Sequence, residues 1–198
     1  MKSMYRAMEI TSPGVFSLVE RTIPTPGAGQ VRIRIEACGV CHSDAATVEA
    51  QFPNLSYPRV PGHEVIGRIE EVGPGVTTWK TGQRVGVGFF GGEDGTCEAC
   101  RRGETVYCQN PIITGVTTDG GYAEMMIAEA RALALIPDEL KSGDAAPLVC
   151  GAPVLNLAAR VVRLAGTDRM GLQLDNNGPG PTRRLQEFLL PLILAKTD

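Results

Sequence analysis

One of the two histidines in this 198-residue chain, His63, stands directly beside a carboxylate, Glu64, where a turn leads into an apolar run. An imidazole and a carboxylate side by side can both face a metal ion, but neither would hold one alone. Two cysteines elsewhere in the chain, Cys41 and Cys150, could add thiolates. Two thiolates and one imidazole, with a fourth position left for water or substrate, form the ligand set of a catalytic zinc ion. The sequence therefore predicts a catalytic zinc site at Cys41, His63 and Cys150, which Glu64 can approach.

A histidine in a turn is more often a hydrogen-bonded polar residue than a metal ligand. The spacing around His63 favours the metal interpretation, because glycines follow it at 67 and 73 and a valine at 76, in one long pattern. A pattern of this kind is a hypothesis that its structural context must confirm.

Three side chains close to Cys41 admit two interpretations each. Cys38 forms a C-x-x-C pair with it, but the βαβ setting of a redox pair is missing, so we interpret Cys38 as a small buried residue. The hydroxyl of Ser43 could pass a proton from a metal-bound alcohol, or it could serve only as a turn residue. The carboxylate of Asp44 could accept a hydrogen bond from the ring of His63 and so fix it, or it could be the N-cap of a following helix.

A second set of metal-binding side chains lies between 94 and 108. Cys97, Cys100 and Cys108 supply three thiolates, and Asp94 precedes Cys97 by the same three-residue step that separates Cys97 from Cys100. A carboxylate oxygen is an acceptable zinc ligand. The sequence predicts a closed structural zinc site with one aspartate and three cysteines in an exposed loop; the alternative is three free thiols in a flexible loop.

Composition narrows the class of protein. Hydrophobic residues make up 43% of the chain and charged residues 21%, as in soluble globular proteins. The net charge of −3, without a basic stripe, argues against a nucleic-acid partner. The start of the chain lacks an apolar signal core, and no apolar run approaches the roughly 18 residues that span a bilayer. We expect a cytoplasmic protein without a membrane partner, whose six cysteines serve metal binding or catalysis rather than disulfides.

Short strands punctuated by glycine and proline must position these residues. Apolar and polar residues alternate over 31–37, which predicts a half-buried strand, and further strands are predicted over 65–72 and 84–89. An extended stretch follows over 122–128, after a turn at 119–121. Many short strands joined by such turns indicate a mainly β fold with short helices (α+β), either a barrel or a sandwich.

These motifs together resemble the GroES-like catalytic domain of the medium-chain zinc alcohol dehydrogenases, over residues 5 to 150. The motifs that carry the resemblance are Gly39-Val40-Cys41-His42-Ser43-Asp44, the Gly62-His63-Glu64 pattern, Cys97-Glu98-Ala99-Cys100-Arg101-Arg102-Gly103 with Cys108, Gly120-Gly121-Tyr122-Ala123-Glu124, and Cys150. The resemblance implies a GroES-like barrel, two zinc ions per chain, NAD or NADP as cofactor, an alcohol or aldehyde as substrate, and a possible homo-oligomer.

The resemblance also implies roles for individual residues. Cys41, His63 and Cys150 would hold the catalytic zinc, and Glu64 would approach it. Ser43 resembles the proton-relay hydroxyl of the family, His42 the residue near the cofactor phosphates, and Phe90 a substrate-pocket position. Asp94 replaces the first of four lobe cysteines, so this chain departs from the pattern at the structural metal.

The resemblance fades after Cys150. We expect a connecting helix over 153–165 and an apolar helical face over 182–195, but no dinucleotide fingerprint. The nearest candidate, Gly178 to Arg183, has two prolines where backbone N–H groups should face a pyrophosphate. We therefore expect a GroES-like zinc-binding catalytic domain over 1–150 and, over 151–198, a connecting helix and a divergent tail in place of a complete Rossmann domain.

Two functions fit these expectations. The first is a zinc-dependent oxidoreductase of the alcohol dehydrogenase type, which transfers a hydride between an alcohol and NAD(P) with zinc as the Lewis acid. The second is a truncated, catalytically silent zinc-binding remnant, or an interaction partner of a full-length relative. Titration of NADH or NADPH against the protein discriminates between them.

Overall fold

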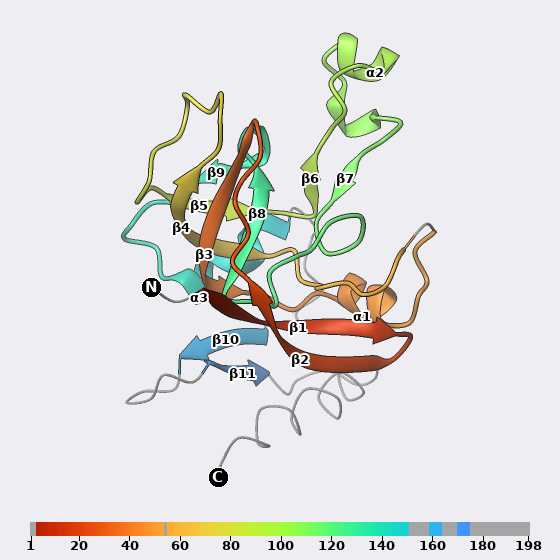
Figure 1. Ribbon diagram of the computed structural model, residues 1–198, viewed down its shortest axis with the longest axis vertical. Coiled ribbons are helices and arrows are strands. Elements are labelled where there is room, and N and C mark those ends of the chain that lie inside the picture. The colour runs from red at the N-terminus through yellow and green to blue at the C-terminus, as the bar shows by residue number, and fades with distance from the viewer. Residues whose placement is uncertain (1–2, 54, 151–158, 164–169, 175–198) are drawn as a thin grey trace.

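The computed structural model describes residues 3–53, 55–150, 159–163 and 170–174 (Figure 1). The strands are β1 (Met4–Ser12), β2 (Val15–Thr22), β3 (Gln30–Cys38), β4 (Val65–Val72), β5 (Arg84–Val87), β6 (Phe90–Gly92), β7 (Ile112–Ile113), β8 (Met125–Glu129), β9 (Ala134–Leu135), β10 (Ala159–Arg163) and β11 (Met170–Leu174). The helices are α1 (His42–Val48), α2 (Glu98–Arg101) and α3 (Ser142–Ala145), with 3₁₀ helices η1 (Thr105–Tyr107), η2 (Ala130–Ala132) and η3 (Ala146–Cys150). The predicted fold class, mainly β with short helices, is confirmed.

A five-stranded antiparallel sheet in the order β8-β3-β4-β5-β9 forms the centre of the fold. Along β3 every second side chain is buried, as the alternating pattern predicts, so Val31 and Ile33 are fully enclosed in the core. The facing strand β4 adds Val65 and Ile69, also enclosed. The strands predicted over 31–37 and 65–72 are confirmed. Cys41 follows β3 and His63 precedes β4, so these two candidate metal ligands lie at the same end of the antiparallel pair.

Gly67 on β4 lies in close contact with the backbone of β3. It pairs with Ile35, and a Cβ atom at this position would overlap the carbonyl oxygen of Arg34 and lie 2.6 Å from Cγ2 of Ile33. The space for a methyl group is absent, so glycine is required here by packing.

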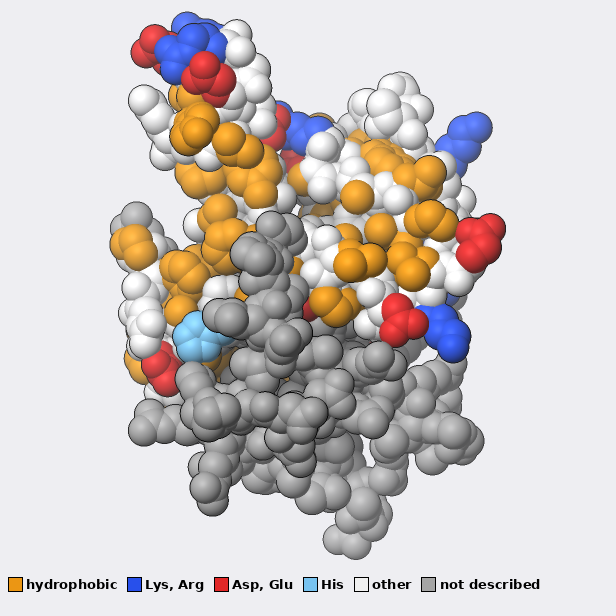
Figure 2. Space-filling view, turned by 180° about the vertical axis from the view of Figure 1, so that it is seen from behind, with side chains coloured by type: hydrophobic (Ala, Val, Ile, Leu, Met, Phe, Trp, Pro, Cys, Tyr) orange, Lys and Arg blue, Asp and Glu red, His pale blue; other side chains and the backbone are white. Residues whose placement is uncertain are grey.

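The strands β6 and β7 carry a lobe away from the central sheet, with α2 at its far end (Figure 1). Charged side chains gather at its tip (Figure 2). Arg102 lies 2.6 Å from Glu98 and 3.0 Å from Glu104, in exposed ion pairs. Such pairs contribute little to stability, so the lobe needs another source of order.

Two predicted extended segments differ from the structure at their ends. The strand expected over 84–89 ends at Val87, and Phe90 begins β6. The stretch expected over 122–128 becomes a strand only at Met125. The backbone just before Met125 is instead hydrogen-bonded to the loop before His63: the N–H of Tyr122 donates to the carbonyl of Pro61 at 3.0 Å.

The expectations for 151–198 are tested only in part. Residues 159–163, expected in a helix, form β10 and pair antiparallel with β11, so the helix prediction is wrong for these residues. The adjacent β-branched Val161 and Val162 favour an extended backbone. The rest of the expected helix, the glycine-rich 178–183 and the apolar face over 182–195 lie outside the described residues. Within the described ranges, no helix has the length and apolar character to cross a membrane.

The packing at Gly67 gives a direct test of the sheet. Gly67→Ala should lower the free energy of unfolding by about 1–3 kcal/mol, because the new methyl group must displace the β3 backbone. Gly143→Ala, in α3, meets no atom within 4 Å and should leave stability unchanged or slightly raised. Urea unfolding followed by circular dichroism measures both, and equal stability of the two variants would contradict this packing.

Candidate metal centres

Three separate segments bring Cys41, His63 and Cys150 together. Cys41 is the N-cap of α1, just after β3; His63 precedes β4; and Cys150 ends η3. The sulfur of Cys150 lies 3.8 Å from the sulfur of Cys41 and 3.8 Å from Nε2 of His63. Two thiolates that are each about 2.3 Å from a tetrahedral zinc lie about 3.8 Å apart. The arrangement therefore fits zinc without rearrangement.

The buried carboxylate of Asp44 organises this group. Its Oδ1 accepts from the backbone N–H of Gly62 at 3.2 Å and lies 3.2 Å from Nδ1 of His63. Its Oδ2 accepts from the backbone N–H of Cys41 at 2.8 Å and from the hydroxyl of Tyr122 at 2.9 Å. Asp44 is thus the third helical residue of α1 rather than its N-cap, and it leaves Nε2 of His63 free for a metal.

The site attracts positive charge. Burial alone would lower the pKa of His63, but hydrogen bonds to Asp44 and Cys41 outweigh it and raise this pKa to about 11. The hydrogen bond with His63 lowers the pKa of Cys41 to about 7 despite its burial. Cys38, by contrast, is buried with a raised thiol pKa, as the sequence predicts for a residue that is not a ligand. A metal cation bound by Cys41 and His63 would replace a proton on Nε2 and compensate the negative charge of the site in its place.

Glu64 is buried beside the same group, and its carboxylate belongs to the set of ligand atoms that lie within 4.8 Å of one another. Burial raises the pKa of this carboxyl group. A Cβ atom at residue 39 would overlap Oε2 of Glu64, so Gly39 leaves the space that the carboxylate occupies.

The hydroxyl of Ser43 faces the metal-binding atoms. It lies 3.3 Å from the sulfur of Cys41 and 3.3 Å from Nε2 of His63. The rings of Phe89 and His63 meet in a T-shaped contact with centroids 5.0 Å apart. The centroid of the Phe52 ring lies 6.2 Å from that of Phe89. The expected pocket residue was the neighbouring Phe90, which begins β6 and is partly buried.

The second group, in the lobe, joins Asp94, Cys97, Cys100 and Cys108 within 4.8 Å. The sulfur of Cys97 lies 3.4 Å from that of Cys100 and 4.0 Å from that of Cys108. Oδ1 of Asp94 accepts from the backbone N–H groups of Thr96 and Cys97, and Oδ2 accepts from Asn110 at 2.8 Å. The bond from Cys97 N–H and those from Asn110 and Thr96 lower the pKa of Asp94, so an ionised carboxylate faces the three thiols.

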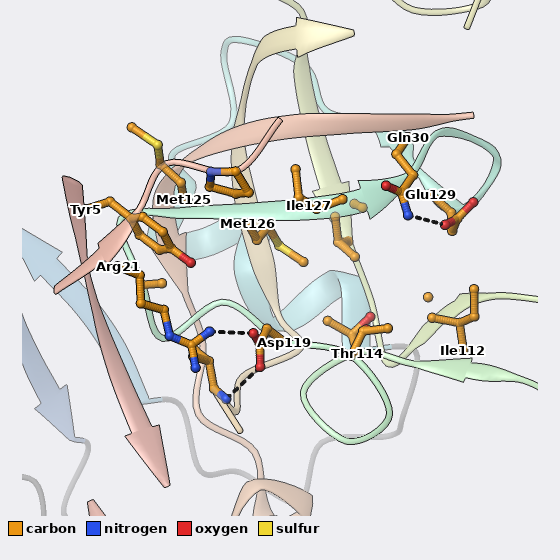
Figure 3. A pocket seen from close by; sticks show the side chains of 18 of the residues that line it. Tyr5, Arg21, Gln30, Ile112, Thr114, Asp119, Met125, Met126, Ile127 and Glu129 are labelled. Atoms are coloured by element: carbon orange, nitrogen blue, oxygen red, sulfur yellow. Dashed lines mark hydrogen bonds and ion pairs between the residues drawn. The ribbon is translucent and has the colours of Figure 1, made fainter. Parts of the chain in front are cut away.

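A further pocket of about 370 Å³ lies under β8, away from both groups (Figure 3). Polar side chains that line it bond to one another: Arg21 pairs with Asp119 at 2.6 Å, and the amide of Gln30 donates to Glu129 at 2.9 Å. Neither group of potential metal ligands lines this pocket.

The structure brings together the predicted residues of each group, and their roles as zinc ligands stay predictions. His42, expected near a cofactor phosphate, is exposed as the first residue of α1, and its role stays a prediction. Sequence reasoning missed Tyr122 and Phe89. The signal for Tyr122 was its place in the Gly120–Glu124 motif, but only the fold shows its contact with Asp44.

Comparison with known proteins agrees with the fold. Residues 27–138 match the family described as alcohol dehydrogenase GroES-like domain. The chain is 42% identical over 152 residues to alcohol dehydrogenase patD of Aspergillus clavatus, covering 76% of this chain and 39% of that protein. It is 36% identical over 189 residues to NADP-dependent alcohol dehydrogenase C of Mycobacterium bovis, covering 86% and 54%.

Solved structures agree as well. The cobalt- and zinc-bound thermostable alcohol dehydrogenase of Pyrobaculum aerophilum superposes with a TM-score of 0.63 at 34% identity, over 70% of this chain and 43% of that one. The chain thus spans between two fifths and about half the length of these relatives. Family match, identity and fold together show that the chain belongs to the zinc-containing medium-chain alcohol dehydrogenases, whose GroES-like domain it contains.

Proposed function

We propose that this chain supplies the zinc- and substrate-binding part of an alcohol dehydrogenase that oxidises an alcohol to an aldehyde or ketone with NAD or NADP as hydride acceptor. The observation that carries the proposal is the convergence of Cys41, His63 and Cys150 at zinc-compatible distances, with the hydroxyl of Ser43 against two of them. The names of relatives that are alcohol dehydrogenases support the substrate class.

The chemistry follows from the residues around the site. Zinc, when bound, supplies Lewis acidity toward the oxygen of an alcohol, and a nicotinamide accepts the hydride. Ser43 would relay the proton of the substrate hydroxyl: its oxygen would accept that proton while its own hydroxyl proton passes outward to water, since this hydroxyl already lies among the ligand atoms. Asp44 holds the ring of His63 in one tautomer and one orientation, which keeps Nε2 available.

Phe89 and Phe52 would form the apolar side of the substrate site. The rings of Phe89 and His63 lie nearly perpendicular to each other, and the ring of Phe52 lies tilted beside that of Phe89. An aromatic wall beside the reacting oxygen excludes water and favours alcohols with an apolar substituent.

The lobe group would hold a second, structural zinc through Asp94, Cys97, Cys100 and Cys108. All four positions of a tetrahedral site are then filled by protein, which suits a structural ion. Such an ion would order a lobe whose own surface ion pairs are weak.

Asp44→Asn tests the organisation of the catalytic group. Asparagine keeps the shape but loses an acceptor, so zinc affinity at Cys41, His63 and Cys150 should fall about 10- to 100-fold. Tyr122→Phe, which removes one donor to Asp44, should show a smaller loss. Competition with a chromogenic chelator measures both. Glu20→Gln, an exposed carboxylate on β2, is the matched control, and equal affinity in all of these proteins would argue against the role of Asp44.

Asp94→Ala tests the lobe. Without its carboxylate the lobe should lose its zinc and become sensitive to protease, whereas Asp94→Cys should retain zinc because thiolate suits this ion. Elemental analysis should change from about two zinc ions per chain to about one in Asp94→Ala. If Asp94→Ala keeps two zinc ions and its protease resistance, Asp94 is not the ligand that completes the lobe site.

Ser43→Ala tests the proton transfer. For assay, the chain is joined after Cys150 to the remainder of the mycobacterial relative, and alcohol-dependent NADP reduction is followed by absorbance. Ser43→Ala should lower kcat about 100-fold while zinc content stays unchanged, because general acid–base catalysis is lost. Ser17→Ala, in β2, is the matched control. Full activity of Ser43→Ala, or of His63→Ala in the same fusion, would refute the proposed mechanism.

A further inference from the structure

The third proposed zinc ligand, Cys150, is delivered by a different part of the fold from the other two. Cys41 and His63 flank the β3–β4 pair and both bond to Asp44. Cys150 ends η3, which follows α3 and packs against β4 and β5. The position of its sulfur therefore depends on how the segment from Pro137 to Cys150 is attached to the sheet.

A buried arginine on β5 makes this attachment. Nη1 of Arg84 donates to the carbonyls of Pro137 and Leu140, each at 2.6 Å, and Nη2 donates to Oγ of Ser142 at 2.7 Å. Nε of the same side chain donates to Oε2 of Glu36 at 3.0 Å. Ser142, the first residue of α3, also donates to that oxygen at 2.8 Å. We call Arg84, Glu36, Ser142 and the two carbonyls the arginine clasp.

Arg84 lies buried at the centre of the clasp, and Glu36 and Ser142 are partly buried. Arg84 is only 5% exposed, and a guanidinium at such depth is tolerated because Glu36 compensates its charge. Burial pulls the pKa of Glu36 upward, but hydrogen bonds from Ser142 and Arg84 outweigh it and keep this pKa below its ordinary value. Four of these five hydrogen bonds reach the segment from Pro137 to Ser142, and such directed bonds fix the start of α3 in position and orientation.

From the clasp onward the path to Cys150 is tightly packed. Ala145 and Ala146 are buried against the sheet. A Cβ atom at residue 86 would lie 2.7 Å from Cγ1 of Val149, and one at Gly88 would overlap the Val149 carbonyl. Gly86 in β5 and Gly88 just after it thus let Val149 lie directly on the backbone of this strand. A shift at Ser142 would therefore displace Cys150.

We propose that the arginine clasp is the positioning device for the third zinc ligand: Arg84, through Ser142 and the segment that follows, sets the sulfur of Cys150 at metal distance from Cys41 and His63. The inference rests on the proposed zinc site. Arg84 is a positioning residue and has no contact with the metal ligands in the interactions described here, which makes its effect separable from that of a ligand.

Four variants of the full chain test the clasp. Arg84→Lys keeps the charge but cannot reproduce the forked set of donors, and Ser142→Ala removes one bond while leaving the Arg84–Glu36 pair intact. Ser142→Thr restores a hydroxyl and is the conservative control. Arg34→Gln removes a surface arginine on β3 that pairs with Glu70 at 3.3 Å and has no bond to the clasp among the interactions of the described residues.

The measurement is alkylation of each cysteine by iodoacetamide in zinc-loaded protein, read by mass spectrometry, together with chelator competition. In Arg84→Lys and Ser142→Ala, Cys150 should be alkylated about 10-fold faster and zinc affinity at this site should fall about 10-fold. Cys97, Cys100 and Cys108 in the lobe should stay protected, and Ser142→Thr and Arg34→Gln should behave as the unmodified chain.

The outcomes separate the clasp from the zinc site itself. If zinc protects Cys150 equally in all five chains, the clasp does not position it and the inference is overturned. If every cysteine loses protection together in Arg84→Lys and Ser142→Ala, the role is general stability, which overturns it too. If zinc fails to protect both Cys41 and Cys150 in the unmodified chain, the proposed zinc site is refuted and the inference falls with it.

Discussion

The buried carboxylate of Asp44 is the interaction on which the catalytic group depends. It joins the backbone of Cys41, the loop at Gly62, the ring of His63 and the hydroxyl of Tyr122. A buried carboxylate is costly unless each of its oxygens is hydrogen-bonded, and here both are. Each oxygen has two hydrogen-bond partners, so the loss of one donor leaves a second on the same oxygen. Loss of the carboxylate would remove these hydrogen bonds from all four groups.

The sheet makes that interaction possible. Because β3 and β4 are antiparallel neighbours, Cys41 after β3 and His63 before β4 come to the same end of the pair. The buried valines and isoleucines of these strands, with Gly67 between them, keep that end of the pair in place. Arg84 performs a corresponding task for the segment that leads to Cys150. The two thiols and the imidazole are thus positioned by two hydrogen-bonded groups, one around Asp44 and one around Arg84.

The sequence was informative where chemistry requires a residue type and less so where packing decides. Cys41, His63 and Cys150 could be grouped from their types alone, because few side chains bind zinc, and the strand over 31–37 followed from its alternation. Asp44 could be assigned to His63 as one of two alternatives. Tyr122, Phe89 and Arg84 could not, since their partners lie 78, 26 and 48 residues away, respectively, at Asp44, His63 and Glu36, and only tertiary contact shows them. The helix expected over 153–165 was wrong at 159–163 because an apolar periodicity does not account for adjacent β-branched valines.

The most direct test of the catalytic zinc site is a crystallographic anomalous-difference map of the purified chain, recorded at the zinc absorption edge. The site predicts a peak bounded by the sulfurs of Cys41 and Cys150 at about 2.3 Å and Nε2 of His63 at about 2.0–2.1 Å. Asp44 should remain on Nδ1 of that ring. An anomalous peak at this place without Cys150 among its ligands, or no peak there in zinc-saturated crystals, would contradict the proposed site.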